Sequence, residues 1–124
     1  FPLSKKRLPP HAISIVDEYL EHARVLVFYN KGKERVFISS ADWMVRNLDY
    51  RVEAAVEIID STIRKEMLSI LEIQLADNVK ARLLNDSLNN QYALSNTKKS
   101  VRSQVLIADF LQRASSRRFN KQPS

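Results

Sequence analysis

Glycine, cysteine and histidine are scarce in this chain, and each shortage excludes a class of site. The single glycine, Gly32, cannot build a P-loop or a GxGxxG nucleotide loop, because each of these motifs needs at least two glycines. The absence of cysteine excludes disulfides, thiolate zinc sites and cysteine nucleophiles. Only His11 and His22 are present, so a histidine-rich metal cluster is excluded as well.

Long apolar runs are also missing. No run approaches the ~20 residues that cross a bilayer, and the basic start FPLSKKRLPP has no apolar segment behind it. We therefore expect no transmembrane segment and no secretory signal. A cytoplasmic location is the corresponding expectation. The 124 residues, 44% hydrophobic and 27% charged, fit one globular domain or part of one.

The net charge of +6 is concentrated towards the C-terminal end. Residues 1–60 carry nine basic and nine acidic side chains, whereas residues 61–124 carry eleven basic and five acidic ones. From residue 98 onwards, the basic residues are Lys98, Lys99, Arg102, Arg113, Arg117, Arg118 and Lys121. Such an end can attract a polyanion, but a solvated helix face followed by a frayed tail is the commoner explanation.

Apolar spacing predicts an alternating α/β chain. The predicted helices are 11–22, 60 or 61 to about 75, and 98–114, and the predicted strands are 24–29, 35–39 and 51–59. Gly32 provides a positive φ in the turn between the first two strands, which we expect to form a hairpin. The first strand is apolar on both faces, which suggests burial from both sides. Residues 40–50 are expected to be irregular or one short helical turn, and the type of 77–96 stays open.

The organisation expected along the chain has three parts. Residues 1–10 form an arm or a boundary, residues 11–114 form the α/β unit, and residues 115–124 form a disordered basic tail. Three or four short strands and three helices close only a thin core. We therefore expect this unit to be a fragment of a larger fold.

His22 ends the first predicted helix, two residues before Arg24. A histidine at a helix C-terminus most often makes a favourable contact with the helix dipole. The alternative is a proton carrier or phosphate ligand beside a guanidinium, because histidine titrates near neutral pH. The spacing alone leaves both interpretations open.

The densest group of polar residues lies in 39–53, between two predicted strands. Ligands collect at such an edge of the sheet in α/β proteins. Small hydroxyl residues (Ser39, Ser40) and arginines (Arg46, Arg51) can donate to phosphate oxygens, and three acids (Asp42, Asp49, Glu53) can orient the arginines or hold a cation. A polar connection whose acid–arginine pairs satisfy one another is an equally weighted alternative.

Three stretches carry a family resemblance: LEHARV at 20–25, ISSADWMVRNLDYRVE at 38–53 and LADNVKAR at 75–82. Together they closely resemble the C-terminal catalytic domain of bacterial polyphosphate kinase. The resemblance covers roughly residues 13–110. It implies a partial phospholipase D-like domain, an α/β fold with a mixed β-sheet flanked by helices.

Members of the phospholipase D superfamily carry an HxK motif, then a turn of small residues and, further along the chain, an acid. In this chain, His22 and Arg24 fall on the HxK motif, residues 39–42 on the turn, and Glu53 on the acid. Three positions depart from those motifs: Arg24 stands for lysine, Tyr29 for aspartate and Asp42 for asparagine. An arginine fork replaces a point charge, and an added acid lies near the phosphate position. This half is therefore expected to be degenerate as a phospholipase site.

The resemblance implies an enzyme that reversibly transfers the terminal phosphoryl group of ATP to inorganic polyphosphate, through a phosphohistidine and with Mg²⁺. It places the phosphohistidine, the adenine-binding domain and most magnesium ligands outside this chain, so the isolated chain is expected to be inactive. It makes His22 a proton donor or a contact to phosphate or ATP. Phosphate binding is expected of Arg24, Ser39, Ser40, Arg46, Asn47 and Arg51, an orienting role of Asp42, Asp49 and Glu53, and no metal ligand in this chain.

The implied partners are polyphosphate, ATP or ADP, the upstream domains of the same enzyme and, at full length, further copies of it. Two alternatives remain open at this point. One is half of a phospholipase D-type phosphodiesterase, and the other is a non-catalytic polyanion-binding module that uses the basic end. Membrane association of the full enzyme is a further open expectation.

Overall fold

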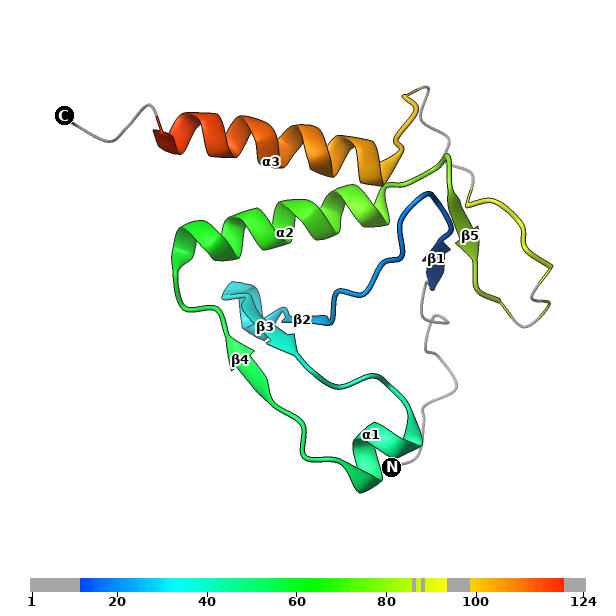
Figure 1. Ribbon diagram of the computed structural model, residues 1–124, viewed down its shortest axis with the longest axis vertical. Coiled ribbons are helices and arrows are strands. Elements are labelled where there is room, and N and C mark those ends of the chain that lie inside the picture. Colours follow the sequence, from blue (N-terminus) through cyan, green and yellow to red (C-terminus); the bar gives the residue numbers. More distant parts are fainter. Residues whose placement is uncertain (1–11, 86, 88, 94–98, 120–124) are drawn as a thin grey trace. The chain divides into compact units, whose positions relative to one another are not determined.

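The computed structural model describes residues 12–85, 87, 89–93 and 99–119 (Figure 1). Its chain divides into two compact units. One unit consists of residues 20–72, and the other combines residues 1–19 with residues 73–124. The predicted arm 1–10 and residues 120–124 of the predicted tail lie outside the described residues.

The unit of residues 20–72 contains a three-stranded antiparallel sheet in the order β2–β3–β4 (Figure 1). The strands are β2 (Val25–Phe28), β3 (Arg35–Ser39) and β4 (Ala55–Glu57). A short 3-10 turn, η1 (Asn30–Gly32), connects the first two strands. Gly32 has a φ of +86°, which side chains rarely allow, so the predicted hairpin and the role of its glycine are confirmed.

The core of this sheet is small. Val36 is fully buried, and the rings of Phe28 and Phe37 meet edge to face with centroids 5.7 Å apart. Val27 is 40% exposed and Phe28 is 55% exposed, so the predicted burial of the first strand on both faces is wrong in this chain. A sheet of three short strands has too few covering elements to bury both of its faces.

Two helices complete this part of the chain. The helix α1 (Val45–Tyr50) lies between β3 and β4. It agrees with the short helical turn that was one of the two predictions for residues 40–50. The helix α2 (Ser61–Leu75) begins after Asp60, whose Oδ1 accepts the backbone N–H groups of Thr62 at 2.8 Å and Ile63 at 2.9 Å. Both the predicted length of this helix and its cap are confirmed.

In the other unit, β1 (Ile13–Ile15) pairs antiparallel with β5 (Ala81–Leu83). The predicted helix over 11–22 is therefore wrong for its described residues, which form a strand followed by an irregular segment. Two β-branched residues at alternate positions, Ile13 and Ile15, suit a strand. Their partner lies almost seventy residues away in a stretch without a clear pattern, so local spacing could not reveal the pairing.

The last helix, α3, spans Ser103–Phe119, whereas the prediction was 98–114. The predicted disorder from residue 115 is accordingly wrong for 115–119, which continue the helix. The physical reason for the late start is an acceptor outside the helix: the backbone N–H of Ser103 donates to Asp77 Oδ2 at 2.7 Å. A carboxylate at that position satisfies a donor that the first turn leaves unpaired.

Asp77 is only 2% exposed and joins the start of β5 to the start of α3. Its Oδ1 accepts the backbone N–H groups of Val79 at 2.9 Å, Lys80 at 2.7 Å and Ala81 at 3.0 Å. Desolvation by burial raises the pKa of Asp77, but the backbone hydrogen bonds outweigh it and lower the pKa to about 2.

The predicted α/β class is confirmed, with the strands in two small sheets rather than in one. Every strand pairing among the described residues is antiparallel. Within the same residues, no helix combines the length and the apolar character that crossing a membrane requires.

Candidate functional site

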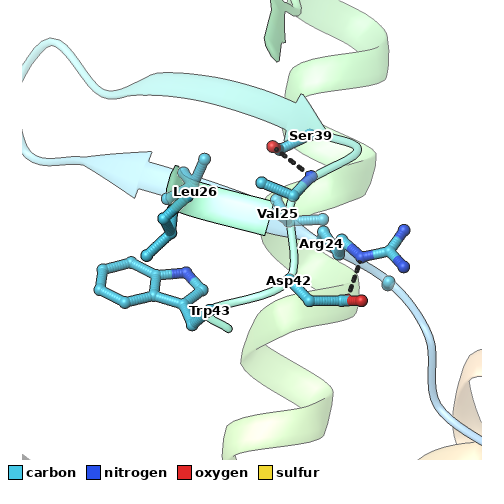
Figure 2. A pocket seen from close by; sticks show the side chains of 9 residues that line it. Arg24, Val25, Leu26, Ser39, Asp42 and Trp43 are labelled. Atoms are coloured by element: carbon cyan, nitrogen blue, oxygen red, sulfur yellow. Dashed lines mark hydrogen bonds and ion pairs between the residues drawn. The ribbon is translucent and has the colours of Figure 1, made fainter. Parts of the chain in front are cut away.

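Arg24, Asp42 and His22 form a chain of polar contacts at the edge of the β2–β3 hairpin. The backbone of Arg24 continues the ladder beyond β2, because its carbonyl accepts the N–H of Ser39 at 2.9 Å. Its Nε donates to Asp42 Oδ1 at 2.5 Å (Figure 2), and its Nη2 lies 2.7 Å from His22 Nε2. The guanidinium is therefore held between an acid and an imidazole.

His22 lies in an irregular segment before β2, not at the end of a helix. The interpretation of His22 as a partner of a helix dipole is therefore wrong. A guanidinium only donates hydrogen bonds, so the contact with Arg24 makes Nε2 of His22 the acceptor. The ring then carries its proton on Nδ1.

The ion pair between Arg24 and Asp42 is only partly covered, with 26% and 31% of the two side chains exposed. The hydrogen bond from Arg24 lowers the pKa of Asp42, while desolvation opposes this shift. The same hydrogen bond raises the pKa of Arg24. Both groups are thus charged near neutral pH, and the pair fixes the direction of the guanidinium.

A pocket of about 390 Å³ lies beside this pair. Its lining comprises Ala23, Arg24, Val25, Leu26, Ser39, Ala41, Asp42, Trp43 and Leu48. Figure 2 shows Trp43 close to Leu26, with the Arg24–Asp42 pair on the other side of the view. Sequence reasoning missed this apolar side; the available signal was Trp43, the only tryptophan of the chain, which is 87% exposed.

Ser39 and Ser40, at the start of the turn that follows β3, differ in whether their hydroxyl groups are still able to bind a ligand. Ser39 lines the pocket, and its Oγ accepts the N–H of Ala41 at 3.1 Å, so its own O–H is still a donor. Ser40 Oγ accepts the N–H of Ala54 at 3.1 Å and donates to Glu53. The hydroxyl of Ser40 is therefore committed to the turn.

Asn47, within α1, and Glu53, which follows that helix, hydrogen-bond to each other, and Glu53 also accepts from Ser40. Asn47 is 2% exposed, and its Nδ2 donates to Glu53 Oε1 at 2.7 Å. The hydrogen bonds from Ser40 and Asn47 lower the pKa of Glu53 against its desolvation. These contacts place Asn47 and Glu53 in the framework of residues 40–53 rather than on its exposed surface.

The remaining predicted residues, Arg46, Asp49 and Arg51, are exposed. The positive charge of Arg46 contributes to the lowered pKa of Asp42, and that of Arg51 contributes to the lowered pKa of Glu53. Across the described ranges, no three His, Cys, Asp or Glu side chains come together in a group that could hold a metal ion. The turn thus brings several cations around two engaged carboxylates.

Residues 10–104 match the family model described as polyphosphate kinase C-terminal domain 2. The chain belongs to the polyphosphate kinase family. A polyphosphate kinase from Yersinia pestis is 50% identical over 99 residues, covering 80% of this chain and 14% of that protein. One from Escherichia coli K12 is 46% identical over 101 residues, covering 82% and 15%.

A solved structure agrees with these relatives. The crystal structure of polyphosphate kinase from Porphyromonas gingivalis superposes with a TM-score of 0.81 at 49% identity, over 86% of this chain and 16% of that one. The family and the partial α/β domain expected from the resemblance are confirmed. The chain spans only 14–16% of the length of these polyphosphate kinases.

Proposed function

We propose that this chain is the part of a polyphosphate kinase that supplies phosphate contacts and a proton-donating histidine. The complete enzyme reversibly transfers the terminal phosphoryl group of ATP to inorganic polyphosphate. The observation that carries this proposal is the contact chain from His22 through Arg24 to Asp42 at the edge of a pocket. The family membership supports it, because the relatives reported above are named polyphosphate kinases.

The chemistry of this contact chain suits a phosphoryl group. Phosphoryl transfer depends on positioning and on neutralising negative charge more than on covalent partners. Arg24 is held by Asp42, which lowers the cost of orienting the guanidinium towards an anion. His22 accepts from Arg24 through Nε2, so its Nδ1–H is the group that hydrogen-bonds a phosphate oxygen. The ring donates a proton to that oxygen only after Nε2 has left Arg24 and taken up a proton of its own.

The exposed arginines extend the same role. Arg46 and Arg51 reach along a phosphate chain, and Ser39 adds a hydroxyl at the pocket wall. Asp42 orients Arg24, and Glu53 keeps the turn in shape through Ser40 and Asn47. Asp49 adds an exposed acid beside these cations.

ATP and Mg²⁺ belong to the complete enzyme in this proposal. The described carboxylates do not fit a magnesium site on their own, because Asp42 is bonded to Arg24 and Glu53 to Ser40 and Asn47. The phosphohistidine and the adenine site are assigned to other parts of the enzyme, which acts in the cytoplasm as an oligomer. The isolated chain should therefore show no ATP-dependent polyphosphate synthesis; ADP release coupled to polymer growth would contradict this assignment.

A chimera tests the role of His22. Residues 10–104 would replace the matching domain of the Yersinia pestis polyphosphate kinase, with which this chain shares 50% identity. We expect His22→Gln to lower kcat about 10²–10⁴-fold, the usual contribution of an acid–base group, at an unchanged melting temperature. The control is His11→Gln, which removes the only other histidine and should leave kcat within about twofold.

Two results would speak against the proposal. A His22→Gln chimera with a normal kcat and a lowered melting temperature would make His22 a structural residue. Cleavage of a bis-aryl phosphodiester by this chain, abolished by His22→Gln, would instead support the phosphodiesterase alternative.

A further inference from the structure

Arg82 occupies the middle of the small sheet in the unit of residues 1–19 and 73–124. Within β5 it pairs with Ser14 of β1 on one side and forms a bridge to Tyr92 on the other. Its guanidinium carbon lies 3.3 Å from the centre of the Tyr92 ring. The ring of Tyr92 covers one face of the guanidinium and helps to hold the side chain in place.

The guanidinium of Arg82 has buried donors without acceptors. Its Nε and Nη1 are shielded from solvent, and among the residues that the structure describes they have no hydrogen-bond partner. Three other arginines make contacts with carboxylates: Arg24 with Asp42, Arg35 with Glu57, and Arg102 with Asp17. A permanently charged group whose buried N–H donors are unpaired is costly, so the site favours a bound acceptor that none of the described residues provides.

A second pocket, of about 260 Å³, adjoins this side chain. The described residues that line it are Ser14, Val16, Arg82, Leu83, Leu84 and Asn90, and none of them is acidic. The hydroxyl of Ser14 and the side-chain amide of Asn90 add two neutral donors to the guanidinium. Several donors and one positive charge in a space of this size fit a small tetrahedral oxyanion.

We propose that the pocket formed by Ser14, Arg82 and Asn90 binds a phosphate group, either free phosphate or the end of a phosphate chain. This site is independent of the function proposed above, because its residues belong to the unit of 1–19 and 73–124, whereas His22, Arg24 and Asp42 belong to the unit of 20–72.

The test is a titration of the ¹⁵N-labelled chain with orthophosphate and, separately, with tripolyphosphate, followed by NMR. We expect saturable shifts of the backbone amides of Ser14 and Leu83 and of the Arg82 Nε–H. Arg82→Gln should weaken this binding about tenfold or more, and Ser14→Ala about threefold to tenfold. Tighter binding of tripolyphosphate at these signals identifies a chain end as the ligand, and equal binding identifies free phosphate.

The matched control is Arg113→Gln, which removes the same charge from an exposed position of α3. It should change the binding less than twofold. The proposal is overturned if the three signals do not move, since water would then satisfy Arg82, or if Arg113→Gln weakens binding as much as Arg82→Gln. If Arg82→Gln does not fold, Ser14→Ala and Arg82→Lys decide, because both keep the positive charge.

A variant at the other site separates the two proposals. Arg24→Gln should leave the shifts of Ser14, Leu83 and Arg82 unchanged. Loss of those shifts in Arg24→Gln would overturn the independent phosphate site, whereas the kcat of the His22→Gln chimera reports only on the function proposed above.

Discussion

Two arginine–aspartate ion pairs in this chain differ in how fully the partners are buried and hydrogen-bonded to each other. We call a buried, two-bond pair closed and a partly exposed, one-bond pair open. Arg102 donates to both oxygens of Asp17, from Nε at 2.8 Å and from Nη2 at 2.7 Å, and only 1% of the Asp17 side chain is exposed. Arg24 uses a single nitrogen on Asp42, shares another with His22, and leaves both partners of the pair about a quarter or more exposed. The same two residue types therefore make a closed pair in one unit and an open pair in the other.

The closed pair has little capacity left for a ligand. Arg102 also reaches Glu18 at 3.3 Å, and the hydrogen bond from Arg102 lowers the pKa of Asp17. Asp77 is closed in the same sense, because four backbone N–H groups fill its two oxygens. The open pair keeps donors in contact with a pocket, so a carboxylate that orients a cation without enclosing it marks the candidate site.

The largest expected effect comes from breaking the most closed carboxylate. Asp77→Asn replaces an acceptor of four N–H groups by an amide that has one accepting oxygen. We expect the free energy of unfolding to fall by about 2–4 kcal/mol, which urea denaturation followed by circular dichroism measures. Asp109→Asn, on the exposed side of α3, should change it by less than about 0.5 kcal/mol; equal losses would contradict the special role of Asp77.

Acid should remove the same stabilisation. The folded-state pKa of Asp77 is about 2, against an ordinary value of 3.8, so its contribution to the free energy of unfolding is complete above about pH 4 and is lost as the pH falls through 2. At 1.36 kcal/mol per pKa unit, the contribution is about 2 kcal/mol. Unfolding measured at several pH values should show the gap between wild type and Asp77→Asn narrowing by this amount from pH 5 to pH 2. A constant gap would show that Asp77 is not the titrating group.

Removing one arginine from each pair compares the two directly. Arg102→Gln leaves Asp17 covered and without its main partner, whereas Arg24→Gln leaves Asp42 in contact with water. We expect Arg102→Gln to lower the melting temperature by several degrees and Arg24→Gln to lower it by a few degrees at most. Scanning calorimetry measures both variants, and the opposite order would reverse our assignment of open and closed pairs.

The smallest expected effect concerns where a polyanion binds. Arg46→Ala and Arg51→Ala should each weaken tripolyphosphate binding about threefold to tenfold, because the turn beside Ser39 holds other donors in place. Neutralising Arg117, Arg118 and Lys121 together should weaken it less than twofold in 0.15 M salt, where exposed charges are screened. The side chains of these three residues lie outside the described part of the structure.

Calorimetric titrations at two salt concentrations measure this difference, since contacts to phosphates release counterions. If the neutralised tail loses binding and both arginine variants keep it, the chain is a polyanion anchor of the kind that the basic end suggested. The role given to residues 39–53 would then be wrong.

Several predictions were correct because the features concerned depend only on residues that are close in sequence. The β2–β3 hairpin depends on a six-residue connection, residues 29–34, with Gly32 at positive φ, and the start of α2 depends on Asp60 and the two N–H groups that follow it. The family resemblance was equally readable, because rare residues such as Trp43 stand in one long motif. These features need only neighbours along the chain, so they were accessible without a structure.

Within the candidate site, the sequence indicated a segment that also lines the pocket, but not the hydrogen bonds of its side chains. Ser40, Asn47 and Glu53 look equivalent to Ser39 and Arg46 as polar residues of 39–53, yet they bond to one another. The apolar wall of the pocket also went unnoticed, because Leu26 and Trp43 come from separate segments. Which polar groups are consumed by the turn depends on how it closes, and local spacing does not describe that closure.

The sequence by itself determined the hairpin, the capped helix α2 and the family, since each depends on short-range turn chemistry or on a contiguous motif. Only the tertiary structure decided that Ile13–Ile15 is a strand, because β5 supplies its hydrogen bonds from almost seventy residues further along the chain. The tertiary structure also decided which arginine–aspartate pair is closed and which is open. Asp17 and Asp42 are the same residue type, and their different burial arises from the segments that fold over them.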